Sequence, residues 1–241
     1  VKHLEQAGLE VEVGGRPILW HILKIYSAHG INDFVICLGY KGHMVKEYFA
    51  TYYLRNSDVV VDVQKRSIEV QSSSAEPWRV TLIDTGDETG TGGRLKKVLP
   101  QVADDDIFCM TYGDGVADID ITALIAFHRA HGKLATVTAT RPVPRFGVIH
   151  LDGNRVREFE EKPHGEEDWV SGGFFVLSPK IGEYIEGDEI YWERAPMRRL
   201  IELGELQAYR HDGYWQPMDT LRDRQNLEIE WASPNPAWKV W

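Results

Sequence analysis

The sequence has few cysteines, no long apolar run and no excess of positive charge. Its two cysteines, Cys37 and Cys109, lie inside apolar strand-like runs, so we interpret both as buried small hydrophobic residues rather than a disulfide or metal-binding pair. Neither a signal peptide nor a membrane-spanning stretch is found, so we expect a cytoplasmic protein without a membrane partner. The 27 basic and 37 acidic residues give a net charge of −10, which argues against nucleic-acid binding.

The remaining composition is that of an ordinary globular protein, with 43% hydrophobic and 27% charged residues. No linker or internal repeat is recognisable, and we expect a single domain over residues 1–241. Predicted strands at 33–40, 80–84, 107–110 and 134–140 alternate with predicted helices that start near Pro17, Gly42, Arg94 and Ile121. This alternation predicts an α/β fold: a Rossmann-like, doubly wound, mostly parallel mixed sheet.

Short β-excursions are expected beside this sheet. The segment 58–70 reads as one, with a loop at 72–74, and 147–159 reads as a hairpin around Asp152-Gly153-Asn154. A strand at 173–177, a helix at 197–203, a strand at 206–210 and a last helix after Asp219 follow. The aromatic tail at 233–241 could pack on the body or on a neighbouring subunit.

The segment 107–120 carries the clearest signal for a site. A continuous apolar run stops at Gly113-Asp114-Gly115, where glycine permits a sharp turn and close approach to a ligand. Asp114 would therefore follow a central strand at its carboxyl end, where open α/β sheets bind ligands. An aspartate there can ligate Mg²⁺, which takes one or two carboxylates plus phosphate oxygens. The alternative is a plain Asp-Gly turn that closes the strand.

Asp219 is the proposed partner of Asp114, because it also stands between a predicted strand and a helix. If the sheet brings their loops together, the two carboxylates can hold one Mg²⁺ on the phosphates of a nucleotide. The spacing alone does not show that they meet. Asp219 is also a suitable N-cap for the last helix, and the two roles are compatible.

Three further motifs have both a functional and a structural interpretation. Gly92-Gly93-Arg94 offers backbone amides and a guanidinium to a base or phosphate, or it is part of a mobile surface loop; it lacks the P-loop pattern. Lys162, in Glu161-Lys162-Pro163, is a point charge for a phosphate or a solvated surface lysine. His128 and His131 could bind a metal, but at a helix end they more simply stabilise the helix dipole.

Taken together, the longer runs resemble one family. These are GGRPILWHILKIYSAHGINDFVICLGYKG, EPWRVTLIDTG, TGGRLKKV, TYGDGVADIDI, FEEKP, GGFFVLSP, LGELQAYRHDGYWQPMDTLRD and PAWKVW. They are similar to the glucose-1-phosphate cytidylyltransferases, which are sugar-nucleotide pyrophosphorylases of the nucleotidyltransferase class. The resemblance runs over most of the chain, from about residue 11 to residue 241.

The resemblance implies an enzyme that makes CDP-glucose and pyrophosphate from CTP and α-D-glucose 1-phosphate, with Mg²⁺ as cofactor. It assigns the metal to Asp114 and Asp219, which with Lys162 form the catalytic set. It further implies a homo-oligomer, and a product that feeds dideoxy-sugar, O-antigen or polysaccharide biosynthesis.

The resemblance also assigns the two sides of the substrate site. Thr89 and Arg94 face the nucleotide, and Gly113 lets the sheet edge approach the ligand. Lys162 binds the sugar phosphate. Glu161 and the turn at Gly172 and Gly173 lie near the sugar hydroxyls.

Two departures from the family pattern stand out. The family begins with an apolar strand, a GGxGTR loop and a Lys-Pro-Lys-Pro segment, and residues 1–10 show none of these. That strand is expected at the sheet centre, where its loss would expose several apolar side chains at about 1.5–3 kcal/mol each. We therefore expect either a truncated active enzyme or a catalytically impaired nucleotide-binding homologue. Ser171 replaces the usual Asn before Gly-Gly-Phe-Phe, and its shorter hydroxyl would weaken a sugar contact. A sibling nucleotidylyltransferase that uses another base or sugar is a further alternative.

Overall fold

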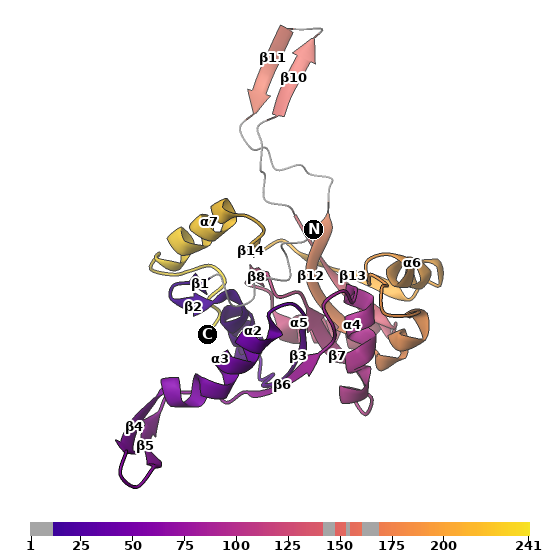
Figure 1. Cartoon of the computed structure of the whole chain (residues 1–241). Coiled ribbons are helices and arrows are strands. Elements are labelled where there is room, and N and C mark those ends of the chain that lie inside the picture. Colours follow the sequence, from indigo (N-terminus) through magenta and orange to yellow (C-terminus); the bar gives the residue numbers. More distant parts are fainter. Residues whose placement is uncertain (1–11, 142–147, 153–154, 161–168) are drawn as a thin grey trace.

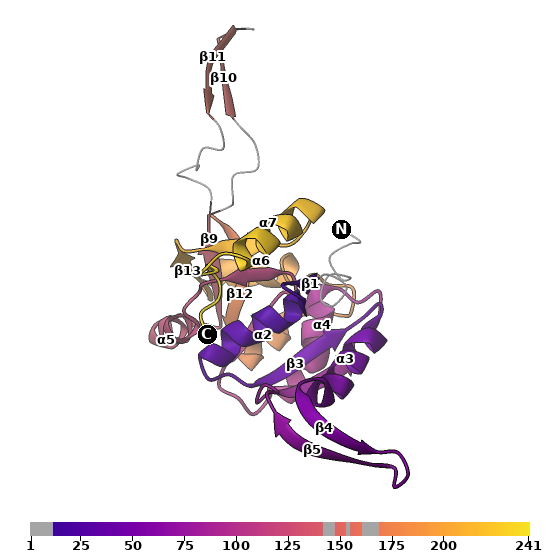
Figure 2. The ribbon, with the colours of Figure 1, turned by 90° about the vertical axis from the view of Figure 1, so that its left-hand side faces the viewer.

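The structure, a computed structural model, describes residues 12–141, 148–152, 155–160 and 169–241. Its centre is a four-stranded sheet in the order β13, β9, β12, β7. Figure 1 labels β7, β12 and β13, and Figure 2 labels β9. β9 and β13 are parallel, whereas β12 runs antiparallel to both β9 and β7. The strands are β7 (Phe108–Thr111), β9 (Ala135–Thr140), β12 (Val170–Leu177) and β13 (Leu206–His211).

Helices pack on both faces of this sheet, because the side chains of β12 alternate between two cores. Phe174 and Val176 join one core with residues of α2 (Ile18–Ala28) and α5 (Ile121–His131). Phe175 and Leu177 join the other core with residues of α4 (Thr91–Val98) and α6 (Ala195–Glu202). A sheet covered on both faces is what the alternating pattern predicted. The predicted mixed α/β class is confirmed.

A second, parallel pair of strands lies beside the central sheet. β3 (Asp33–Leu38) pairs in register with β6 (Arg79–Asp84), and α3 (Gly42–Arg55) packs against β6. Within the described residues this pair shares no ladder with the four-stranded sheet. The apolar side chains at 34–37 of β3 and along β7 are only half-buried, although continuous apolar runs of this kind predict buried strands. Cys37 and Cys109, on these two strands, are free thiols; both were predicted to be buried, and both are half-buried.

Helix ends follow the capping residues. α5 begins after Asp120, whose carboxylate accepts from the Ala123 amide at 2.9 Å, and it ends at Gly132 with φ +65°. α4 begins three residues earlier than the predicted Arg94 and stops at Val98. The residues that follow, Leu99–Gln101, form a 3₁₀ turn, because Pro100 cannot donate a backbone hydrogen bond to continue the helix.

Two hairpins confirm the predicted β-excursions. β4 (Ser57–Asp62) pairs with β5 (Ser67–Ser73) and projects from the body below α3 (Figures 1 and 2). β10 (Val148–Asp152) pairs with β11 (Arg155–Glu160). The loop predicted at 72–74 is wrong for Ser72 and Ser73, which continue the ladder of β5.

The carboxyl-terminal tail packs on the body of the same chain. It follows α7 (Leu221–Trp231), and Trp238 is fully buried against Trp231 and His21. His21 Nε2 lies 2.9 Å from the Val13 carbonyl, and its Nδ1 accepts from the Trp238 indole at 3.4 Å. A carbonyl can only accept, so the ring is neutral with its proton on Nε2. Burial lowers the pKa of His21 to about 4.

Short elements complete the chain. They are β1 (Glu12–Val13), β2 (Arg16–Pro17), β8 (Gly115–Ala117), β14 (Trp215–Pro217) and the 3₁₀ helix η3 (Pro179–Tyr184). Among the described residues, the helices are all too short or too polar to cross a membrane.

Candidate active site

Asp114 and Asp219 are brought together by the small antiparallel ladder between β8 and β14. Asp114 directly precedes β8, and Asp219 lies two residues beyond Pro217 at the end of β14. Pro217 pairs with Gly115, and the Met218 amide donates to the Asp114 carbonyl at 2.7 Å. Two residues distant in the chain therefore stand at one end of one ladder.

The charges of the two aspartates interact. Burial and, after it, the neighbouring charge of Asp219 together raise the pKa of Asp114 to about 6. Within the described residues, no group of three or more His, Cys, Asp and Glu could hold a metal ion. A cation here would thus take two carboxylates and complete its coordination with water and phosphate oxygens, which suits Mg²⁺. The donor set fits that ion, because a divalent cation would relieve the repulsion between the two carboxylates, which helps to raise the pKa of Asp114.

Asp219 is not the N-cap of the last helix, contrary to the structural interpretation. Thr220 caps α7: its hydroxyl accepts from the Asp223 amide at 3.1 Å, and the Asp223 carboxylate accepts from the Thr220 amide at 3.0 Å. This is a capping box, and its Thr-x-x-Asp spacing was readable in the sequence. The helix start is therefore satisfied without the Asp219 carboxylate.

Thr89 lies in the loop after β6, and Arg94, in the first turns of α4, reaches back to that loop. The Arg94 guanidinium donates to the Leu38 carbonyl at 3.0 Å, to the Thr85 hydroxyl at 2.7 Å and to the Asp87 carbonyl at 3.2 Å. The buried Thr89 hydroxyl donates to the Thr85 carbonyl at 2.5 Å. Both side chains thus hold the loop in shape, and their contact with a nucleotide stays a prediction.

The glycines at the start of α4 serve the packing of two backbones. The Gly90 amide donates to the Asp188 carbonyl at 2.8 Å, and the Gly93 amide donates to the Ile190 carbonyl at 3.1 Å. A Cβ on Gly93 would lie 2.1 Å from the Asp188 oxygen. The loop is therefore fixed against 188–190, and the Gly93 amide is already occupied, so it does not offer the phosphate contact that the sequence suggested. A contact through the Gly92 amide stays a prediction.

The glycines expected near the ligand, Gly113 at the sheet edge and Gly172 and Gly173 near the sugar, differ from one another. Gly113 is exposed, with open space where a Cβ would be. Gly173 has φ +77°, and a Cβ there would lie 2.8 Å from the Tyr112 ring. The carbonyl of Gly172 accepts from the Trp215 indole at 2.8 Å, which ties the start of β12 to β14. Ser171 is exposed.

Other predicted residues do not join this group. Glu161 and Lys162 lie outside the described residues. His128 and His131 both contact the Thr136 hydroxyl at 2.8 Å, and burial lowers the pKa of each ring. They tie α5 to β9, a structural role.

Two contacts near Asp114 had no functional signal in the sequence. Tyr112, two residues before it, donates its hydroxyl to the Glu193 carboxylate. Thr91, at the start of α4, donates to the other oxygen of Glu193 at 2.8 Å. Tyr112 belongs to the TYGDG run, but a surface glutamate before α6 carries no pattern.

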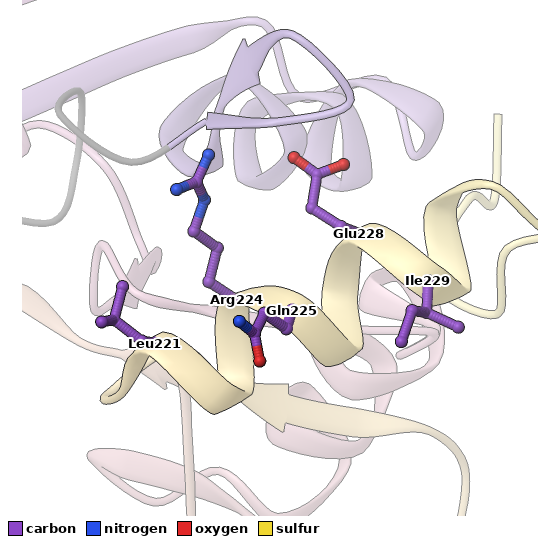
Figure 3. Close-up of a pocket in the computed structure, with 5 residues that line it drawn as sticks. All are labelled: Leu221, Arg224, Gln225, Glu228 and Ile229. Carbon is purple, nitrogen blue, oxygen red and sulfur yellow. The ribbon is translucent and has the colours of Figure 1, made fainter.

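A shallow depression of about 390 Å³ lies on α7, away from these contacts (Figure 3). Arg224 and Glu228 reach from it to the backbone of Glu12 and Gly14, respectively. Leu221 and Ile229 are 76% and 72% exposed. Neither Asp114 nor Asp219 lines it, so we place the candidate site at the aspartates.

A mixed α/β sheet with paired carboxylates at a strand edge is typical of proteins that bind phosphates with a divalent cation. Residues 5–218 match the family model described as nucleotidyl transferase. The chain therefore belongs to the nucleotidyl transferase family.

Particular relatives narrow the comparison. The chain is 54% identical over 231 residues to glucose-1-phosphate cytidylyltransferase of Salmonella typhi, covering 96% of this chain and 90% of the relative. It is 37% identical to a probable glucose-1-phosphate cytidylyltransferase of Bacillus subtilis, covering 95% and 89%. The crystal structure of HddC from Yersinia pseudotuberculosis shares the fold, with a TM-score of 0.67, 17% identity and coverage of 92% and 88%. The resemblance seen in the sequence is confirmed.

Proposed function

We propose that the chain is a glucose-1-phosphate cytidylyltransferase, which converts CTP and α-D-glucose 1-phosphate to CDP-glucose and pyrophosphate. The observation that carries the proposal is the Asp114–Asp219 pair in a chain 54% identical to an enzyme of that name. A phosphate oxygen of glucose 1-phosphate forms a bond to the α-phosphorus of CTP. The bond from that phosphorus to the bridging oxygen breaks, and pyrophosphate leaves with the electron pair.

The protein contributes position and charge to this transfer. Asp114 and Asp219 hold Mg²⁺, which when bound supplies positive charge against the phosphates. Asp114 does so in its ionised form, so metal binding displaces its proton when the pH lies below about 6. Raising the pH from below about 6 to above it therefore strengthens metal binding.

The other assignments complete the proposal. Thr89 and Arg94 form the nucleotide side, Gly113 lets the sheet edge approach the ligand, and the turn at Gly172 and Gly173 lies near the sugar hydroxyls. Glu161 and Lys162 bind the sugar phosphate and its hydroxyls. A cytoplasmic homo-oligomer that supplies CDP-glucose to O-antigen or polysaccharide biosynthesis remains our expectation.

Pyrophosphate release by the purified protein, with glucose 1-phosphate, Mg²⁺ and either CTP, UTP or dTTP, tests the proposal. We expect turnover with CTP, its loss with EDTA, and its loss in Asp114→Ala and in Asp219→Ala. Asp104→Ala is the matched control, because Asp104 is an exposed loop carboxylate.

Other outcomes of that assay would each assign a different function. Preference for UTP or dTTP would make the chain a sibling enzyme. Stabilisation by CTP without any turnover would make it a binding homologue. Near-normal rates in either alanine variant would remove that aspartate from the metal site.

A further inference from the structure

Glu193 lies two residues before α6, and side chains from two segments distant in the chain donate to its carboxylate. Tyr112, at the end of β7, donates to Oε1. Thr91, the first residue of α4, donates to Oε2 at 2.8 Å and also accepts from the Trp192 amide at 2.9 Å. The carboxylate is thus held on both oxygens by groups whose own positions are fixed.

The Tyr112 ring connects Glu193 to the sugar-side turn. It occupies the space that Gly173 leaves by lacking a Cβ. It packs edge-on against Phe175 at 5.8 Å, and Phe175 packs edge-on against Trp192 at 6.2 Å. The last of these rings, Trp192, is next to Glu193 in the chain, so this packing fixes the position of the carboxylate relative to the turn at Gly173.

The carboxylate keeps capacity for further hydrogen bonds. Glu193 is exposed, and an ionised carboxylate offers about four lone-pair positions, of which Tyr112 and Thr91 use two. Phosphate groups repel a carboxylate, so the substrate groups suited to this position are hydroxyls. Tyr112 stands two residues before Asp114 in the chain, so the carboxylate lies at the rim of the aspartate site.

We propose that Glu193 determines sugar specificity by accepting hydrogen bonds from hydroxyl groups of the hexose phosphate. The inference rests on the proposed function and adds a ligand to its sugar side. A hydrogen bond to a charged group is worth about 1.5–3 kcal/mol. Glu193→Gln should therefore weaken binding of glucose 1-phosphate about ten- to hundredfold, because the amide is neutral and its nitrogen can only donate.

Calorimetric binding of α-D-glucose 1-phosphate and its 2-, 3-, 4- and 6-deoxy analogues, to the native protein and to Glu193→Gln, tests this independently of turnover. We expect one analogue to lose affinity for the native protein but to bind both proteins equally, because the missing hydroxyl and the missing charge remove the same contact. Glu189→Gln, an exposed glutamate of the same segment, should behave like the native protein. Pyrophosphate release, followed separately, reports on the proposed function.

Three results would overturn the proposal. An equal loss for every analogue in Glu193→Gln would show that the residue only supports the fold. A coupling seen with 2′- or 3′-deoxy-CTP instead would assign the carboxylate to the ribose. No binding of glucose 1-phosphate by the native protein would remove the hexose site. If Glu193→Gln does not fold, Glu193→Asp gives the same comparison, since it retracts the carboxylate by one methylene.

Discussion

Replacing Asp114 with asparagine should stabilise the protein in the absence of metal, although it should abolish activity. The pKa of Asp114 is raised from 3.8 to about 6 by burial and by Asp219. At 1.36 kcal/mol per unit, the ionised carboxylate costs about 3 kcal/mol of folding free energy at neutral pH. Asparagine has the same shape and carries no charge, so the variant avoids this cost.

The pH dependence gives the prediction its sign. Because the folded-state pKa is above the unfolded value, the contribution of Asp114 to stability is full below about pH 3.8 and is lost as the pH rises to about 6. The asparagine variant does not titrate. Its advantage should grow from about 1 kcal/mol at about pH 4.5 to about 3 kcal/mol at about pH 7.5.

Urea unfolding with EDTA, at four pH values between about 4.5 and about 7.5, measures the difference in stability between the variant and the native protein. Asp104→Asn, at an exposed loop, is the control and should show no such trend. Adding Mg²⁺ and CTP should narrow or reverse the gap, because they bind only the folded protein with both aspartates. A gap that is absent at about pH 7.5, or constant with pH, would refute the reasoning.

Three smaller predictions follow from the fold. His21 has a lowered pKa, so native stability should fall as the pH drops from about 6.5 to about 4, and His21→Gln should weaken that dependence in thermal unfolding. Gly93→Ala should cost about 2–4 kcal/mol, because its Cβ meets the Asp188 carbonyl, whereas Gly113→Ala should cost less than about 1 kcal/mol; equal costs would contradict the packing argument. Thr220→Ala should lose about 1 kcal/mol in denaturant unfolding through the missing cap, and an unchanged midpoint would exclude the capping box.

The sequence predicted the long elements well because their apolar periodicity is sustained. The helix over Ile121–His131 and the strand over Asp33–Leu38 were visible in this way. The β8–β14 ladder was not, because three residues per strand are too few to show a period. It is this ladder that places Asp114 beside Asp219, so the pair could be proposed from the sequence but its proximity could not be derived.

Other features depended on contacts between segments far apart in the chain. The glycines before Arg94 suggested a mobile or phosphate-binding loop, since nothing local reveals that the backbone at 188–190 packs against them. Glu193 lacked any signal for the same reason: its partners Tyr112 and Thr91 are about 80 and 100 residues away. The cap at Thr220 was a different case, because its local pattern was present and Asp219 was favoured instead.

The close backbone packing between the start of α4 and residues 188–190 changes how the loss of activity in variants of this site should be interpreted. Variants at Gly90 or Gly93 would lose activity because the added side chain separates two packed backbone segments, even if neither glycine contacts a substrate. A mutational scan scored only by turnover would therefore assign too many residues to the proposed nucleotide site. Measuring the melting temperature of each variant alongside its rate separates residues that maintain the fold around the site from residues that contact the substrate.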